Sequence, residues 1–220
     1  YVVGLMQSFM LLEHMEGKKV LLCTGETFCR GNKEKQEPPY YRAPFGGDAA
    51  NITIVENGGQ DKICYEFHQD GTQRECLVIP DGAFRNPMTI EKIQNQIVRM
   101  PLTGVVMDGS TVFNFAQKEV PILVDNLTKM AETTKEDIAW FLFHQPNKFM
   151  LQKLAERIGV PFEKMPMDIV GKFGNSNSAT IPTAITADLK EEMLNKESLC
   201  CLAGFGAGVA WAGIIMKMGN

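Results

Sequence analysis

The stretch AWFLFHQPNKFMLQKLAERIG, residues 139–159, decides the fold class of this chain. Its opening run, AWFLF, is wholly apolar, which is typical of a strand that is buried on both faces. Farther on, Met150, Leu154 and Ile158 recur at the spacing of one buried helix face, and Gly159 is a typical helix stop. A buried strand followed by an amphipathic helix is the repeating unit of an α/β protein.

The same alternation continues on both sides of this stretch. Upstream, a long helix is expected from about 110 to 131, and Pro121 should distort it. Downstream, a helix is expected within residues 174–196, with Ser178 as its N-cap. Two buried strands, SLCCLAGFG and GVAWAGIIMKM, should follow and be joined by a tight turn. Apolar strands separated by amphipathic helices predict a sheet that helices cover on both sides.

The first part of the chain is less regular. Residues 1–16 carry apolar residues at helical spacing, KKVLLCTG is expected to form a short strand, and FGGDAANITIVEN predicts a glycine turn followed by a strand. Residues 30–44 are charged and rich in proline, which indicates a surface loop. Residues 57–93 are polar and irregular, with CYEFHQDG and ECLVIPDG as the expected strands of a meander.

Composition excludes several classes of function. The chain has 220 residues, of which 22 are basic and 26 acidic, and its formal net charge is -4. This mild acidity, without any Lys/Arg cluster, argues against a nucleic-acid-binding protein. No apolar run approaches the roughly 20 residues of a membrane span, so no membrane segment is expected. The six cysteines lack the spacing of metal ligands, which predicts no metal site and a reducing, cytoplasmic location.

Three polar or glycine-rich segments, FHQPN, FGNSNSATIP and GFGAG, could form a site. Ligands of layered α/β proteins gather at the carboxyl ends of strands, and we expect His144 and Asn175 each to follow a strand and precede a helix. An imidazole, a carboxamide and the backbone N–H groups of Gly206, Ala207 and Gly208 can all donate to an oxygen that becomes negative. Taken singly, they could be a structural histidine, a turn former and a hairpin turn. Their order in one α/β segment favours a site for a reaction through an enolate or oxyanion.

These segments resemble the β-ketoacyl-acyl-carrier-protein synthase III family of the thiolase superfamily. HQPN, GNSNSATIP and FGAGVAWAG are similar to the family's H-Q-A-N, G-N-T-S-A-A-S-I-P and F-G-G-G-x-T-W-G segments. FGGDAA and MDGSTVFNFA are similar to its F-G-D-G-A-A turn and M-x-G-x-x-V-F-x-x-A helix start. The resemblance implies a thiolase-like layered αβαβα fold, with residues 1–95 as the remainder of its N-terminal half and 96–220 as its C-terminal half. It also implies a homodimer.

The resemblance implies a decarboxylative Claisen condensation, in which a Cys-His-Asn triad joins an acyl group from acyl-CoA to malonyl-acyl-carrier protein. Such enzymes serve fatty-acid or related polyketide synthesis, carry the acyl group on the cysteine and need no metal or redox cofactor. His144 and Asn175 would hold the malonyl thioester carbonyl and stabilise the enolate formed when carbon dioxide leaves. The N–H of Ala207, in the 206–208 turn, would share an oxyanion hole with the N–H of the cysteine.

The nucleophile of this family is expected outside the chain. YVVGL resembles the residues that follow the family's Cys-x-Gly, so the cysteine should lie about three residues before Tyr1. The family's N-terminal stretch is therefore expected on a second piece that completes the core, without which the chain should not fold alone. Within the chain, Cys23 in LLCTGET imitates Cys-x-Gly, but it follows a predicted strand.

The mouth of the expected site departs from the family. Family members often carry an arginine two residues beyond H-Q-A-N, for CoA or the carrier protein, where this chain has Phe149. We expect Asn147, Lys148 and Phe149 to be the substrate-binding residues there. The altered mouth leaves open an acyltransferase of the same fold that acts without decarboxylation. A non-catalytic partner subunit of a condensing heterodimer is a further alternative, which Gln or Ser in place of the upstream cysteine would favour.

Overall fold

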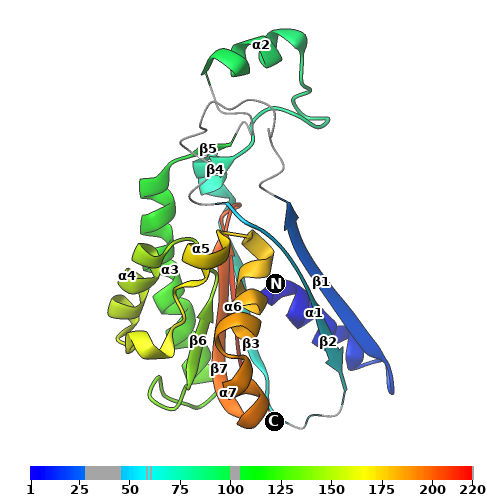
Figure 1. Ribbon diagram of the computed structural model, residues 1–220, viewed down its shortest axis with the longest axis vertical. Helices are drawn as coiled ribbons and strands as arrows, with labels where there is room; N and C mark the ends of the chain where they lie inside the picture. Colours follow the sequence, from blue (N-terminus) through cyan, green and yellow to red (C-terminus); the bar gives the residue numbers. More distant parts are fainter. Residues whose placement is uncertain (28–45, 58, 60, 100–104, 220) are drawn as a thin grey trace.

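The computed structural model describes residues 1–27, 46–57, 59, 61–99 and 105–219 (Figure 1). The loop expected at residues 30–44 lies outside the described residues. The main sheet has four strands in the order β3-β8-β7-β6. β7 pairs parallel with β6 and antiparallel with β8, and β8 pairs antiparallel with β3. These strands are β3 Cys64–Gln69, β6 Trp140–Phe143, β7 Ser198–Gly206 and β8 Ala210–Met218.

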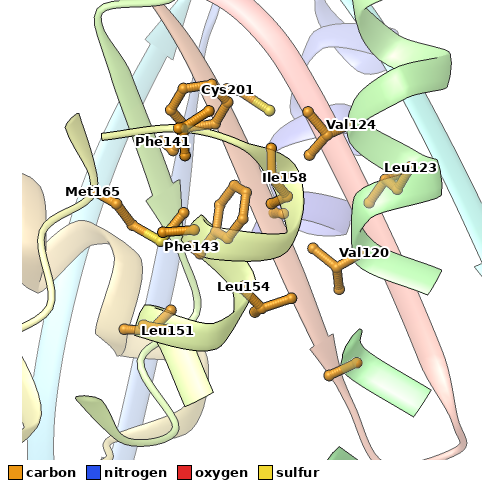
Figure 2. Packing of buried hydrophobic residues seen from close by; sticks show 14 of the residues in the cluster. Val120, Leu123, Val124, Phe141, Phe143, Leu151, Leu154, Ile158, Met165 and Cys201 are labelled. Carbon is orange, nitrogen blue, oxygen red and sulfur yellow. The ribbon is translucent and has the colours of Figure 1, made fainter. Parts of the chain in front are cut away.

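Helices cover both faces of this sheet, as the apolar runs predict (Figure 1). One face carries α3 Gly109–Met130 and α4 Lys148–Ile158, and the other carries α1 Val2–Leu12, α6 Thr180–Asp188 and α7 Lys190–Asn195. The place of β6 between the two helix layers explains why its sequence is apolar at every position. Phe141 and Phe143 pack with α3 and α4 (Figure 2), while Leu142 between them packs with the helices of the opposite face. All three side chains are fully buried.

A separate two-stranded ribbon, β1 Lys19–Thr27 with β2 Asp48–Glu56, lies beside α1 and α6. Its strands correspond to the two strands expected from KKVLLCTG and FGGDAANITIVEN. The burial of its residues alternates along each strand, so one face of the ribbon lies against the helices and the other faces outward.

CYEFHQDG and ECLVIPDG each contain a strand as expected, but the meander expected between residues 57 and 93 is wrong. β3 pairs with β8, and the next strand, β4 Leu77–Val78, pairs with β5 Val106–Met107. Local patterns cannot reveal such pairings, because both partners are distant in sequence. This region also contains the 3₁₀ turn η2 Gly71–Cys76 and the unexpected helix α2 Ile90–Arg99, which stands apart from the sheet layers (Figure 1). β3 precedes residue 95 yet joins the sheet of the later strands, and the division at 95/96 itself stays a prediction.

Two details of the expected helices are also wrong. Ser178 is not an N-cap, because it lies within the 3₁₀ turn η4 Asn177–Ala179, and Ala179 occupies the cap position of α6. The helix expected up to residue 196 is interrupted at Leu189, between α6 and α7. Pro121 lies within α3, which continues on either side of it, and Val120 and Leu123 near it are buried in the core. None of the helices in the described ranges is long and apolar enough to cross a membrane.

Candidate active site

A cavity of about 590 Å³ lies at the carboxyl ends of β6 and β7, where the three predicted segments meet. His144 directly follows β6, Asn175 precedes η4, and Gly206 and Ala207 form the start of the β7–β8 turn. All four residues line the cavity, whereas Gly208 continues the turn without contributing to its lining. The structure therefore brings four of the five residues together around one cavity, and their role as a site stays a prediction.

His144 is fixed on both its backbone and its ring. Its backbone N–H donates to the carbonyl of Ala203 over 2.8 Å, which extends the pairing of β6 with β7. Its Nδ1 lies 2.8 Å from Oγ1 of Thr180, and the ring meets Phe205 edge-on with 5.5 Å between ring centroids. Burial lowers the pKa of His144 from 6.5 to about 4. The imidazole is thus neutral at pH 7 and can exchange a proton or a hydrogen bond with a bound group.

Asn175 is positioned by a crossing of two backbones. Gly47 donates its N–H to the Asn175 carbonyl over 3.0 Å. A Cβ on Gly47 would lie 2.0 Å from the carbonyl oxygen of Phe173, and one on Gly174 would lie 2.3 Å from that of Gly46. Gly174 also has φ of +72°, which L-residues rarely adopt. The segment at Gly46–Gly47 and the segment at Phe173–Asn175 can therefore cross only because glycines stand there.

The expectation that Asn175 follows a strand is wrong. It follows the short helix α5 Ile169–Phe173, which the 3₁₀ turn η3 Phe162–Lys164 precedes. A helix of one turn has too few residues to show a period in the sequence. The amide oxygen of Asn175 accepts the N–H of Asn177 over 2.9 Å. The amide nitrogen is then the atom that can donate to a substrate oxygen.

The glycine turn is held by backbone pairing with the end of β3. Asp70 and Val209 exchange two backbone hydrogen bonds, of 2.9 and 3.1 Å. Gly208 has φ of +135°, a conformation that favours glycine. Because both sides of the turn are fixed, the peptide of Ala207 keeps a defined position at the cavity wall.

The three mouth residues have different environments. Asn147 lines the cavity, and its side chain caps α4 by accepting the N–H of Met150 over 2.8 Å. Lys148 forms an ion pair of 2.7 Å with Asp168. Phe149 is 59% exposed and stacks on Phe113. Lys148 and Phe149 do not line the cavity themselves but lie beside Asn147 at the exposed start of α4.

Most of the cavity wall and the partner of His144 are not evident from the sequence. The wall is largely apolar, and its unexpected members include Phe67, Leu77, Met107, Val112, Phe115 and Trp211. They come from β3, β4, β5, α3 and β8, so no single segment carries the signal. Thr180 lies within SNSATIP, where the helical pattern of the following residues hides its contact with His144.

No cysteine of the described residues lines the cavity. Cys23, which imitates the nucleophile motif, is an exposed residue of β1. Burial raises the pKa of Cys200 to about 12, so this thiol is unreactive at neutral pH. Burial also raises the pKa of its neighbour Cys201. The described cysteines therefore offer no nucleophile for His144 and Asn175.

The layered sheet, with a histidine, an asparagine and a glycine turn around one cavity, defines a protein of the thiolase-like fold class. Residues 128–218 match the family described as 3-Oxoacyl-[acyl-carrier-protein (ACP)] synthase III C terminal. The 3-oxoacyl-(acyl-carrier protein) synthase structure from Burkholderia xenovorans LB400 is similar over the whole chain, with 30% identity and a TM-score of 0.85. This chain covers 61% of that structure.

Curated relatives give the same result. The chain is 30% identical over 218 residues to beta-ketoacyl-[acyl-carrier-protein] synthase III of Synechocystis. This alignment covers 99% of the chain and 64% of the relative. It is 31% identical over 174 residues to the enzyme of that name from Natranaerobius thermophilus, covering 78% of the chain and 51% of the relative. The chain thus spans less than two thirds of either relative. Residues 128–218 thus match the C-terminal part of the 3-oxoacyl-acyl-carrier-protein synthase III family, and the chain as a whole is similar to members of that family.

Proposed function

We propose that the protein carrying this chain condenses an acyl thioester, supplied as acyl-CoA, with malonyl-acyl-carrier protein and releases carbon dioxide. The observation that carries this proposal is the convergence of His144, Asn175 and the Ala207 turn on one cavity. The relatives named above are beta-ketoacyl- or 3-oxoacyl-acyl-carrier-protein synthases, which favours the same reaction class. We further propose that the protein is a cytoplasmic homodimer that needs no metal or redox cofactor.

The imidazole and the carboxamide suit the decarboxylation step. As carbon dioxide leaves the malonyl group, the thioester carbonyl becomes an enolate whose oxygen needs hydrogen-bond donors. Asn175 can offer its amide N–H, and His144 can offer an N–H from the nitrogen that faces away from Thr180 after that nitrogen has taken the proton of the nucleophilic thiol. The backbone N–H of Ala207 would stabilise the oxyanion that forms when the enolate attacks the acyl thioester. The apolar wall suits the alkyl parts of both thioesters.

The nucleophile is proposed to be a cysteine about three residues before Tyr1. Tyr1, Val2 and Val3, at the start of α1, line the cavity beside His144. A residue that immediately precedes this helix turn would be within reach of the same cavity. The N-terminus of a helix also lowers the pKa of a nearby thiol, which favours the reactive thiolate.

Mass spectrometry of the intact protein after incubation with acyl-CoA tests this proposal. We expect one acyl adduct, on the upstream cysteine, and release of carbon dioxide once malonyl-acyl-carrier protein is added. His144→Ala and Asn175→Ala should each lower carbon dioxide release by about 100-fold or more. Lys153→Ala, which removes an exposed cation of α4, is the matched control and should leave the rate unchanged. A folded protein that forms no acyl adduct would contradict the proposal.

An acyltransferase without decarboxylation is a second candidate, favoured by the exposed aromatic side chain of Phe149 where the family often has arginine. It would form the acyl adduct, pass the acyl group to an alcohol or amine, and release no carbon dioxide from malonyl-acyl-carrier protein. A non-catalytic partner subunit is disfavoured by the presence of both His144 and Asn175 at the cavity. It would require the upstream residue to be something other than cysteine.

A further inference from the structure

The imidazole of His144 contacts a buried hydroxyl group through its Nδ1. Thr180 is the first residue of α6, is fully buried, and places Oγ1 2.8 Å from Nδ1 of His144. Two backbone groups contact the same oxygen. The N–H of Gln145 donates to it over 3.3 Å, and the hydroxyl donates to the carbonyl of Asn177 over 2.9 Å. Oγ1 is therefore the centre of three hydrogen bonds.

The chemistry of these groups determines where the protons lie. A hydroxyl has one proton and two lone pairs. The N–H of Gln145 can only donate and the carbonyl of Asn177 can only accept, so the hydroxyl proton goes to Asn177. One lone pair of Oγ1 is left to face Nδ1, and a hydrogen bond forms there only if Nδ1 carries a proton. If the hydroxyl of Thr180 donated to Nδ1 instead, its hydrogen bond to the carbonyl of Asn177 would be lost.

Two further effects agree with this assignment. Burial lowers the pKa of His144 to about 4, so the ring is neutral at pH 7 and carries one proton. The backbone of Asn177 acts on the ring in the opposite direction and favours its protonated form, as a carbonyl beside an N–H does. A neutral imidazole with its proton on Nδ1 has an unprotonated Nε2.

We propose that Thr180 is a positioning residue that keeps the proton of neutral His144 on Nδ1 and so presents Nε2 as a proton acceptor. The geometry that carries this proposal is the set of three contacts around Oγ1. Thr180 acts only through the ring of His144, so it is not itself a catalytic residue. Thr180→Ser is a conservative variant, because it removes only the methyl group and keeps the hydroxyl.

A consequence for the reaction rests on the proposed function. Nε2 takes the proton of the upstream thiol: the S–H bond breaks, the N–H bond forms, and the sulfur attacks the acyl carbonyl. The bond from that carbonyl to the sulfur of CoA then breaks, and CoA leaves as the thiolate. The proton on Nε2 is next available to the enolate oxygen. When condensation breaks the acyl–cysteine bond, the cysteine sulfur recovers this proton, so that the chain returns to its starting state.

Nitrogen NMR of histidine tests the assignment without any activity. The full protein is labelled with ¹⁵N-histidine, and the signals of His144 are those that disappear in His144→Gln. We expect the Nδ1–H tautomer in the unsubstituted protein and in Thr180→Ser, and a shift toward Nε2–H in Thr180→Val. An Nε2–H tautomer in the unsubstituted protein would overturn the proposal, and this spectrum decides even if Thr180→Val does not fold.

Acyl-transfer kinetics separate positioning from a merely structural role. Thr180→Val should slow acyl-adduct formation about 10-fold or more and shift its pH profile, whereas Thr180→Ser should stay within about threefold. Equal rates and pH profiles in folded Thr180→Val and unsubstituted protein would overturn the role. If the unsubstituted protein has the Nδ1–H tautomer but forms no acyl adduct, the proposed function fails and the assignment stands. If it forms the adduct with the Nε2–H tautomer, the assignment fails and the function stands.

Discussion

The strand β6 and the ribbon β1–β2 differ in how deeply their apolar side chains are buried. In β6, Phe141, Leu142 and Phe143 are fully buried between two layers of helices (Figure 2). In the ribbon, Ile52 and Ile54 are 68% and 61% exposed on the outer face. The apolar run in β6 is thus explained by its two buried faces, whereas the outer side of the ribbon keeps large apolar side chains in contact with solvent.

The inner face of the ribbon packs on the core through Val55 and also makes polar contacts close to the site. Asn51 donates to Oγ1 of Thr183 over 3.1 Å, and Asn177 donates to the Glu26 carboxylate over 2.6 Å. The turn that leads into β2 crosses the backbone of Asn175. We therefore expect the sheet core to supply most of the stability, while the ribbon positions part of the site. Substitutions in the two regions should therefore separate stability from activity.

The largest effect is expected in the core. Phe143→Ala removes a fully buried side chain and should lower the free energy of unfolding by about 3–5 kcal/mol, since the tightly packed helices cannot close the cavity. Urea denaturation of the purified protein measures this. Phe162→Ala, at a side chain that is 45% exposed, is the control and should cost about 1 kcal/mol or less. Similar losses at both positions would contradict the difference in burial.

The next effect is expected where the ribbon meets the site. A Cβ at Gly174 would lie 2.3 Å from the carbonyl oxygen of Gly46, and φ at Gly174 is +72°. Gly174→Ala should cost about 1–3 kcal/mol and displace Asn175, so that carbon dioxide release falls further than stability does. Gly171→Ala, where nothing lies within 4 Å, is the matched control and should keep both. Full activity in Gly174→Ala would show that the crossing does not position Asn175.

Sequence patterns predicted the core better than the surroundings of the site. Period and composition reveal β6, β7, β8 and their helices, because each is long or wholly apolar. They do not reveal that β3 pairs with β8, since this pairing joins residues far apart in the sequence. Motif order brought His144, Asn175 and the Ala207 turn together, and these residues do line one cavity.

The contacts that hold the site residues could not be predicted. The crossing of Gly46–Gly47 with Gly174 depends on two backbones that meet through space. The contact of Thr180 with His144 joins the start of a helix to the end of a strand, and a buried threonine at a helix start looks the same whether or not a histidine lies beside it. The apolar cavity wall is drawn from several elements, so none of them carries the pattern alone.

A smaller effect concerns the dependence of stability on pH. Burial lowers the pKa of His144 from 6.5 to about 4 in the folded protein, so between these values the unfolded chain binds a proton that the folded protein does not. The contribution of His144 to stability should therefore be lost progressively as the pH falls from 6.5 toward 4. His144→Gln should show a shallower decrease over this range in urea denaturation. An identical pH dependence in both proteins would mean that His144 titrates normally when folded.

The smallest effect is expected on the outer face of the ribbon. Ile54 is 61% exposed there, so Ile54→Thr removes little buried apolar surface, and threonine is as suitable as isoleucine for a strand. The change in unfolding free energy should stay within about 0.5 kcal/mol. Val55→Thr, on the opposite face of the same strand and 6% exposed, is the matched comparison and should cost about 1–3 kcal/mol. A loss at Ile54 as large as that at Val55, measured in the full protein, would show that a second piece covers the outer face. Both faces of the ribbon would then be buried, as both faces of β6 are.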